Sequence, residues 1–381
     1  MEHNAGYPPN AGPSYGGAPF GQQPYGQAPY GGAPFGQPYR GQPPARRQGL
    51  LERVKRSPAG SRQLLYLGGV FGAAILGHFA LSKLYVYLVS NIGTLKTLYL
   101  EELSFSYLLE MAYTLFAVGL PFLAAWILLR RREPFKNVTI SYGRGYDAYQ
   151  SFMLVFAALG LCLIGNMVTN WLAAAADAVG LGFNSYYAAI EDTDIPTNLT
   201  ETVLLVLHTA VLPALVEEFA FRGVVLQSLR RYGDWFAIVS TSLIFGLMHG
   251  TMTQAPFAVI AGLALGYTAV VTGSLKAGIL VHFLNNGISV VLLLISGRYS
   301  ETVQWMTSAL IMYGMIAVGA AAFLFFILRN RYWRRLRPAK VPVRRPALFF
   351  LLSPPMLFAL MLLIWRTLTD IKVVADVFGT F

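Results

Sequence analysis

Long apolar segments recur along most of the chain, and they indicate what kind of protein it is. From Leu64 onward, successive apolar stretches are long enough to cross a hydrocarbon core of about 30 Å. The fifth and sixth of these stretches are short and rich in glycine, which suits tilted, broken or re-entrant helices. The pattern therefore predicts an all-α, polytopic membrane helix bundle of eight or nine spans. We place the segments near residues 64–89, 106–129, 150–175, 202–229, 235–250, 255–272, 277–297, 305–328 and 347–367.

The composition points to the same class of protein. Hydrophobic residues make up 55% of the chain and charged residues 12%, and the mean hydropathy is +0.51, far from the balance of a soluble globular domain. The single cysteine, Cys162, excludes an internal disulfide and a cysteine metal cluster. The formal net charge of +11 comes from short basic clusters beside apolar segments, so it indicates membrane topology and no nucleic-acid partner.

The N-terminal segment has a different composition from the rest. Residues 1 to about 45 repeat Pro, Tyr or Phe, Gly and Gln, with almost no aliphatic side chains to bury, which predicts a disordered tail. The first strong apolar run begins only near Leu64, so we expect no cleavable signal peptide. We therefore divide the chain into a tail that ends in a basic juxtamembrane stretch, 1–60, and a transmembrane domain, 61–381.

Charge asymmetry between the loops predicts the orientation of the spans. The tail and the loop after the second segment are rich in Lys and Arg, which are retained on the cytoplasmic side. With nine spans, this rule places the N-terminus in the cytoplasm and the C-terminus outside. The tail composition and compact spans favour a bacterial plasma membrane, with the lipid bilayer as a partner. The loop between the third and fourth segments contains no basic residue but carries Asp177, Glu191, Asp192, Asp194 and Glu201.

Charged residues inside membrane segments are candidates for function, because burying them there is costly unless they are paired or hydrated. In the fourth segment, Glu218 and Arg222 stand four residues apart on one helix face, which predicts an ion pair. Glu217 points about 100° away from that face, and a carboxylate without a partner is suited to take a proton from water. Taken alone, this group is explained equally well as an ordinary charged helix end, since Arg230 and Arg231 follow closely.

Histidines on two further segments extend the set of candidates. His249 ends the fifth segment, and His282 and Asn286 lie one helical turn apart in the seventh. A lone histidine in a membrane segment is usually bonded to a backbone carbonyl, and we expect this for His78 and His208, which lack polar neighbours at helical spacing. His249 and His282 instead accompany the Glu pair and Asn286, a combination that can supply a base and oxyanion donors around a water.

Together these residues resemble a known family over about residues 200–295. The CAAX proteases and bacteriocin-processing enzymes (CPBP), also called the abortive-infection family of membrane endopeptidases, carry three motifs in this order and spacing. The resemblance implies a peptidase core in which Glu217 and His249 activate a water for attack on a peptide carbonyl. The matching residues are Glu217-Glu218-x-x-x-Arg222, Phe245-x-x-x-His249 and His282-x-x-x-Asn286.

The same resemblance implies roles for the other motif residues. His282 and Asn286 would stabilise the oxyanion, and Glu218 and Arg222 would form a supporting ion pair. No cofactor is required for this mechanism, although one Glu and two His also permit zinc with a fourth position left for water. We favour the metal-free mechanism, with a membrane-associated peptide or protein as substrate.

Two other functions stay open at this point. The chain is alternatively a non-catalytic membrane immunity or scaffold protein of the same fold, in which the motif residues form a buried polar network. A transporter would use the same charges as an ion or proton path. We rank the transporter last, because no repeated half with broken helices is visible in the sequence.

The composition of the tail leads to the first prediction. Deleting residues 1–45 should leave the melting temperature of the detergent-solubilised protein unchanged, because this segment has almost no aliphatic side chains to bury. Thermal unfolding of the full chain and the truncated chain measures this directly. A fall of several degrees on truncation would contradict the prediction.

Overall fold

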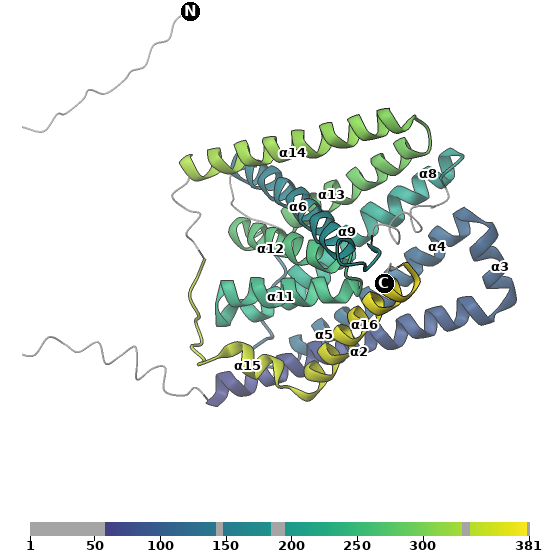
Figure 1. The fold of residues 1–381 in the computed structure, drawn as a ribbon. Coiled ribbons are helices and arrows are strands. Elements are labelled where there is room, and N and C mark those ends of the chain that lie inside the picture. The colour runs from purple at the N-terminus through teal and green to yellow at the C-terminus, as the bar shows by residue number, and fades with distance from the viewer. Residues whose placement is uncertain (1–57, 142–147, 184–194, 330–335, 379–381) are drawn as a thin grey trace, which may run out of the picture. The chain divides into compact units, whose positions relative to one another are not determined.

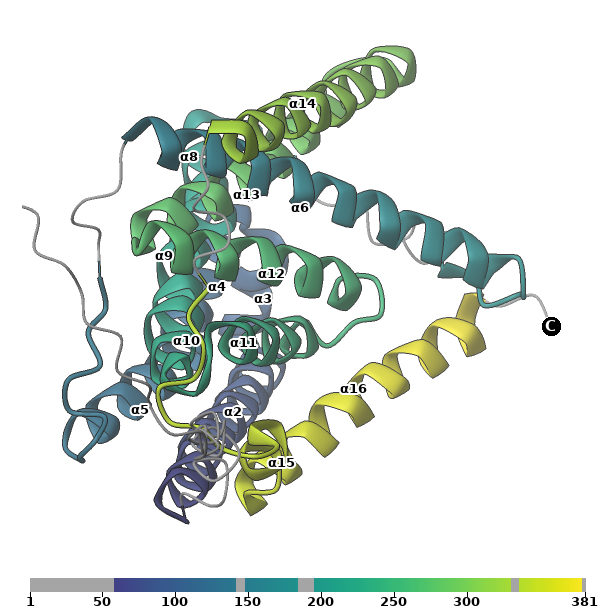
Figure 2. The ribbon, with the colours of Figure 1, turned by 90° about the vertical axis from the view of Figure 1, so that its left-hand side faces the viewer.

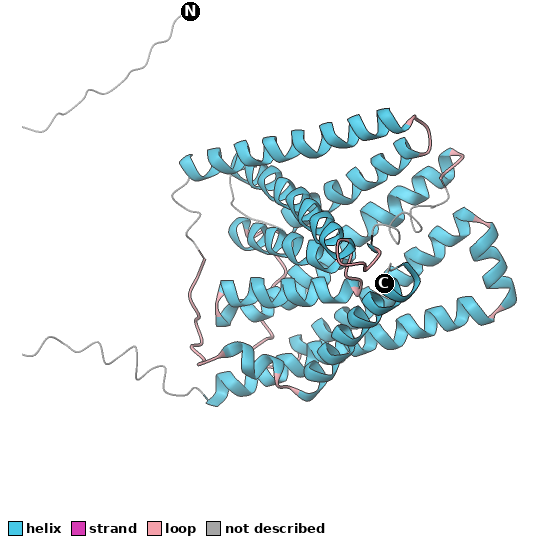
Figure 3. Cartoon of the chain, in the orientation of Figure 1, coloured by secondary structure: helices cyan, strands magenta, loops and turns pink. Residues whose placement is uncertain are grey.

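The computed structural model describes residues 58–141, 148–183, 195–329 and 336–378. The chain divides into two units, Met1–Arg47 and Gln48–Phe381, and all described residues belong to the second. Within them the fold is all-α, with helices and no strands, as the sequence predicts (Figure 3). Residues 1–57 of the predicted tail lie outside these ranges, so its disorder stays a prediction, whereas residues 58–60 already belong to the first helix. The acidic residues Glu191, Asp192 and Asp194 also lie outside them.

The first two apolar segments form a pair of long helices (Figure 1). α2 (Pro58–Asn91) is continuous, whereas the second is a helix with a π-helical stretch in its middle. The two pack against each other through buried aromatic side chains such as Phe71 and Phe122, within one hydrophobic core. The connecting helix is α3 (Gly93–Glu101), and the second long helix consists of α4 (Leu103–Tyr113), η1 (Thr114–Gly119) and α5 (Leu120–Arg130).

A second group of helices packs around the third apolar segment. α6 (Ala148–Asp177) contacts α12 (Ala255–Thr272), α13 (Leu275–Ser296) and α14 (Glu301–Arg329). Its buried residues include Cys162, which is a free thiol packed in this core. The group therefore places the sixth, seventh and eighth apolar segments of the sequence around the third.

The fourth apolar segment is helical throughout but changes its helix type repeatedly. Two π-helical stretches interrupt the α-helix, and one of them contains Glu218 and Arg222. Insertions of this kind are rare in helices and are frequent at functional sites. The successive elements are α8 (Leu199–Val206), η2 (Leu207–Val211), α9 (Leu212–Glu217), η3 (Glu218–Val225), α10 (Leu226–Leu229) and η4 (Arg230–Tyr232).

The C-terminal apolar segment, expected over 347–367, is broken into two helices. α15 (Pro346–Leu351) ends before a pair of prolines, and α16 begins at the first of them (Pro354–Phe378). Prolines have no backbone N–H to continue the preceding helix, which explains the break. Both helices pack on α2, and the far end of α16 reaches α6 through contacts of Val374 (Figure 2).

Seven helices in the described part of the chain are long and apolar enough to cross a membrane. They correspond to the first four and to the sixth, seventh and eighth predicted segments. The fifth segment is α11 (Asp234–His249), whose 16 residues make it shorter than these spans. α16 is not among the seven either, so the count of eight or nine spans is not confirmed. The chain is nevertheless an integral membrane protein by the length and composition of these helices.

Small residues allow the helices to approach closely, as is common in membranes. A Cβ atom added at Gly160 of α6 would lie 2.9 Å from the Cα of Gly319 on α14, so the two backbones touch. On α12, a Cβ at Gly262 would lie 2.9 Å from the Cβ of Ser242 on α11. These contacts leave no room for a side chain at either crossing.

The glycine contact between α6 and α14 gives the second prediction. Gly319→Ala should lower the melting temperature, because the added Cβ would lie 2.7 Å from the Cα of Gly160 and the helices would have to separate. We expect a cost of about 1–3 kcal/mol, as for other overpacked contacts. Gly314→Ala is the matched control on the same helix, since a Cβ there meets nothing within 4 Å. Equal melting temperatures for the two variants would contradict the prediction.

Candidate active site

A polar cavity of about 480 Å³ lies where the fourth, fifth and seventh apolar segments meet. Its lining includes Glu217 from α9, His249 from the end of α11, and His282 and Asn286 from α13. The four residues for which the sequence suggested chemistry thus share one site. The chemical role of each stays a prediction.

The Glu218–Arg222 ion pair expected from their spacing is present at the edge of this site. Arg222 Nη1 lies 2.7 Å from Glu218 Oε1, and both side chains are fully buried. The guanidinium also lies 4.4 Å from the centre of the Phe245 ring, and its Nη2 donates to the Gly262 carbonyl at 3.4 Å. The pair therefore connects η3 with α11 and α12.

His282, which lies on α13, forms a hydrogen bond with the same carboxylate. Its Nδ1 lies 3.1 Å from Glu218 Oε1, the oxygen that also accepts from Arg222. One turn earlier on α13, Gly278 leaves room for this carboxylate, because a Cβ there would lie 2.8 Å from Glu218 Oε2. Sequence spacing predicted the pair with Arg222 but missed the bond to His282, which joins residues 64 positions apart.

The two adjacent glutamates occupy different environments. The Glu218 side chain is 0% exposed, whereas the Glu217 side chain is 21% exposed and lines the cavity. Glu217 Oε2 lies 3.9 Å from His282 Nε2, the ring nitrogen that does not face Glu218. Of the two carboxylates, Glu217 is therefore the one that a water or a substrate can reach.

The hydrogen bond of His249 defines which of its nitrogens is basic. Nδ1 lies 2.8 Å from the carbonyl oxygen of Phe245, one turn earlier on α11. A carbonyl only accepts hydrogen bonds, so Nδ1 carries the proton in the neutral ring. Nε2 of His249 is then the nitrogen able to accept a proton from a water.

Asn286 bonds to a carbonyl oxygen that has no α-helical donor because of a proline. Its Nδ2 donates to the Thr209 carbonyl at 3.0 Å. In an α-helix that oxygen would accept the N–H of residue 213, but this residue is Pro213, which has none. The second N–H of the Asn286 amide is not required by this bond, so it can face a ligand in the cavity.

His78 has the structural role predicted for it, and like Asn286 it bonds to a carbonyl that lies four residues before a proline. Its Nδ1 donates to the carbonyl of Ala117 at 3.0 Å. That oxygen lacks an α-helical donor because Pro121 stands four residues later. His78 therefore compensates for a proline in the neighbouring helix.

The expectation for His208 was wrong. No hydrogen bond to a backbone carbonyl is formed in the described part of the chain, where its buried Nδ1 has no partner. The ring instead stacks on Tyr107, with 5.5 Å between the ring centres, and it lines the cavity. Glu110 of α4 lines the cavity too and was also missed. Its position inside the second apolar segment was the available signal, since a carboxylate there is costly unless it has a function.

A smaller cavity of about 180 Å³ adjoins the site on the side of α16. It is lined by Glu217, His249 and His78, together with Arg366 of α16. The Arg366 Nη2 donates to the carbonyl oxygen of His249 at 3.4 Å. The C-terminal helix, which carries none of the motifs, thus contacts the end of α11 beside the site.

The candidate zinc ligands do not form a metal site as they are placed. Among the described side chains, no three from His, Cys, Asp and Glu are grouped so that they would hold a metal ion. Glu217 and His282 approach each other to 3.9 Å, but His249 is not grouped with them. We therefore derive no step through a metal.

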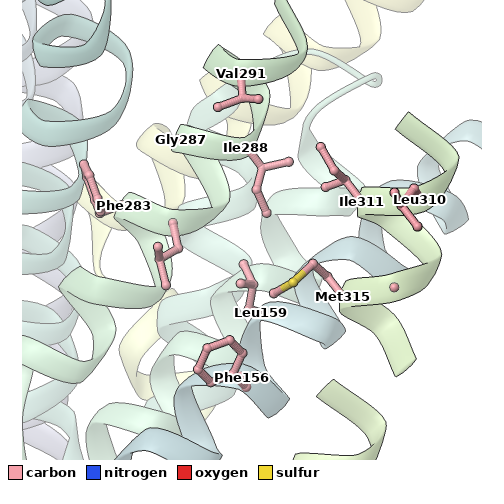
Figure 4. A pocket seen from close by; sticks show the side chains of 11 residues that line it. Phe156, Leu159, Phe283, Gly287, Ile288, Val291, Leu310, Ile311 and Met315 are labelled. Carbon is pink, nitrogen blue, oxygen red and sulfur yellow. The ribbon is translucent and has the colours of Figure 1, made fainter. Parts of the chain in front are cut away.

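A further cavity of about 540 Å³ lies between α6, α13 and α14 (Figure 4). Phe156, Phe283, Ile288 and Met315 are among the side chains that line it. The whole lining is apolar or glycine and holds no titratable group. The motif residues Glu217, His249, His282 and Asn286 therefore line the polar cavity and not this one.

Comparison with known proteins supports the resemblance seen in the motifs. Residues 199–288 match the family model described as type II CAAX prenyl endopeptidase Rce1-like. This range contains all three motifs, and it lies within the 200–295 region of the resemblance apart from its first residue. Neither the curated proteins nor the solved structures gave a match.

The buried ion pair generates the third prediction. Glu218→Gln should lower the melting temperature strongly, because it leaves the fully buried Arg222 without its counter-charge. Removing one partner of a buried pair typically costs about 3–5 kcal/mol. Glu217→Gln is the matched control, since it makes the same chemical change one residue away on a partly exposed side chain. Thermal unfolding in detergent compares the two, and a larger loss from Glu217→Gln would reverse the assignment of the supporting glutamate.

Proposed function

Residues 199–288 carry the sequence pattern of the Rce1-like type II CAAX prenyl endopeptidases, and from this premise we propose that the chain is an intramembrane endopeptidase that uses a glutamate-activated water. The observation that carries the proposal is the contrast within the glutamate pair. Glu218 is buried and paired with Arg222, whereas Glu217 faces a polar cavity that His249, His282 and Asn286 also line.

Glu217 is the proposed general base. In the reaction, the oxygen of a water attacks the carbonyl carbon of the peptide bond, and the Glu217 carboxylate takes a proton from that water. His249 assists by accepting a hydrogen bond from the same water at Nε2, which its bond to Phe245 leaves unprotonated. When the intermediate collapses, the C–N bond breaks and Glu217 returns the proton to the leaving amine.

His282 and Asn286 are the proposed donors to the oxyanion. Asn286 has a second amide N–H beyond the one that bonds Thr209. His282 is proposed to donate from Nε2 as an imidazolium, with Glu218 Oε1 3.1 Å from its Nδ1 and Glu217 Oε2 3.9 Å from its Nε2. Losing one such donor typically raises the barrier by roughly 3–4 kcal/mol.

The substrate class follows from the location of the site within the membrane helices. We propose a membrane-associated peptide or protein as substrate, in a bacterial plasma membrane and with the N-terminus in the cytoplasm. The basic tail and loops support this orientation through the positive-inside rule. Metal assistance is the alternative mechanism, and an immunity or scaffold protein of the same fold is the alternative function.

Removal of the base gives the fourth prediction. Glu217→Gln keeps the size of the side chain but cannot accept the proton, so cleavage should fall by about 10²- to 10⁴-fold while the protein stays folded. The measurement is the cleavage of a mixture of synthetic peptides by purified protein in detergent, followed by mass spectrometry. Glu301→Gln, on an exposed residue at the start of α14, is the control that should keep the wild-type rate.

The same assay distinguishes the alternatives. Cleavage that is lost with a strong chelator and restored by added zinc would replace the metal-free mechanism. A wild-type protein that cleaves nothing, and whose cellular phenotype survives Glu217→Gln, would indicate the scaffold function. Wild-type rates from Glu217→Gln would remove Glu217 from the role of base.

A further inference from the structure

Glu110 is a second carboxylate in the cavity, and the proposed reaction does not use it. It lies on α4, outside the range that matches the family model, yet it lines the same cavity as Glu217 and His282. α4 packs against α8 and η2, which brings Glu110 beside the segment that leads into the glutamate motif. The residue is thus a feature of this chain that the motifs do not explain.

Two tyrosines hold Glu110 in place through one of its oxygens. The hydroxyls of Tyr85 and Tyr99 both donate to Oε1, at 3.1 and 2.9 Å. Burial, reinforced by the charge of Glu110, raises the pKa of Tyr99 to about 12, so this hydroxyl keeps its proton at neutral pH. The other oxygen, Oε2, has no partner among the described residues and is available to a ligand.

Among the described residues, the titratable neighbour that interacts electrostatically with Glu110, besides the two tyrosines, is His208, which lines the same cavity. No Lys or Arg of the described chain forms an ion pair with it. The cavity lining contains two carboxylates, Glu110 and Glu217, three histidines and no Lys or Arg. A carboxylate at a membrane depth is costly without a cation, so this site favours a positively charged group from outside the chain.

We propose that Glu110 binds a lysine or arginine side chain of the substrate, close to the peptide bond attacked by the water that Glu217 activates. This inference rests on the proposed peptidase function and specifies its substrate class as a peptide with a basic residue near the cleavage site. Oε2 would accept from the ammonium or guanidinium, while the two tyrosines keep the carboxylate oriented toward the cavity.

A purely structural role for Glu110 predicts a different outcome. If the residue served only to accept the two tyrosine hydroxyls, the amide oxygen of a glutamine would serve as well. Glu110→Gln therefore removes the charge while keeping the tyrosine bonds. Any change in preference between basic and neutral substrates then reports on the charge.

The test uses the cleavage sites found with the peptide mixture. For each site, it compares three peptides that carry Lys, Met or Glu at one position near the cleaved bond and are otherwise identical. Wild type should prefer the Lys peptide, and Glu110→Gln should reduce the Lys-to-Met ratio of kcat/KM by about ten- to hundredfold, the value of one charged hydrogen bond. Glu102→Gln is the matched control on the same helical hairpin, because its side chain is exposed and does not line the cavity. It should keep the wild-type ratio.

A second measurement needs no variant. Raising the salt concentration should increase KM for the Lys peptide more than KM for the Met peptide, because salt screens the long-range attraction of the basic peptide toward the acidic cavity. An unchanged Lys-to-Met ratio in Glu110→Gln, or no Lys preference in wild type, overturns the proposal. If wild type cleaves no peptide, the peptidase function fails separately. In that case the binding site is tested by measuring the affinities of the Lys and Met peptides for the Glu217→Gln variant and for the double variant that also carries Glu110→Gln. Tighter binding of the Lys peptide that is lost in the double variant supports the proposed binding site. Equal affinities of the two peptides for the Glu217→Gln variant overturn it.

Discussion

The rest of the site depends on the interactions of the buried Glu218 carboxylate with Arg222 and His282. Inside a membrane bundle, an ionised group with no exposed surface must be paired, and Glu218 is paired from two helices, by Arg222 and His282. Arg222 in turn contacts Phe245 on α11 and the Gly262 carbonyl on α12. Removing this charge would leave a cation and an imidazole without their acceptor, so the mutual position of four helices depends on it.

Because Glu218 forms the ion pair with Arg222, the carboxylate of the neighbouring Glu217 stays at the cavity. Adjacent residues on a helix point in different directions, and here one faces the packed interior while the other faces the cavity. The prolines work in a similar way on the backbone. Each proline removes the α-helical donor of the carbonyl four residues earlier, and a side chain from another helix donates to that carbonyl instead. Asn286 does this for the carbonyl four residues before Pro213, and His78 for the carbonyl four residues before Pro121.

Hydropathy predicted most of the fold because length and apolar content are local properties of a membrane helix. Seven of the nine apolar segments correspond to helices long enough to cross a membrane. The segment over 347–367 was taken as continuous because window hydropathy does not register Pro354, at which a new helix begins. The structural role assigned to His208 failed because the absence of polar neighbours along its own helix says nothing about the cavity that other helices form around it.

The sequence by itself determined that this is an all-helical membrane protein, that Glu218 pairs with Arg222, and which residues carry the motifs. These follow from hydropathy, helical spacing and motif order, all of which are readable along one segment. Only the tertiary structure decided that His282 bonds Glu218, that Asn286 bonds Thr209, and that Tyr85 and Tyr99 hold Glu110 at the same cavity. Each of these contacts between the spans depends on which helices become neighbours, and that is settled by the packing of glycine-lined faces and of buried side chains from distant parts of the chain.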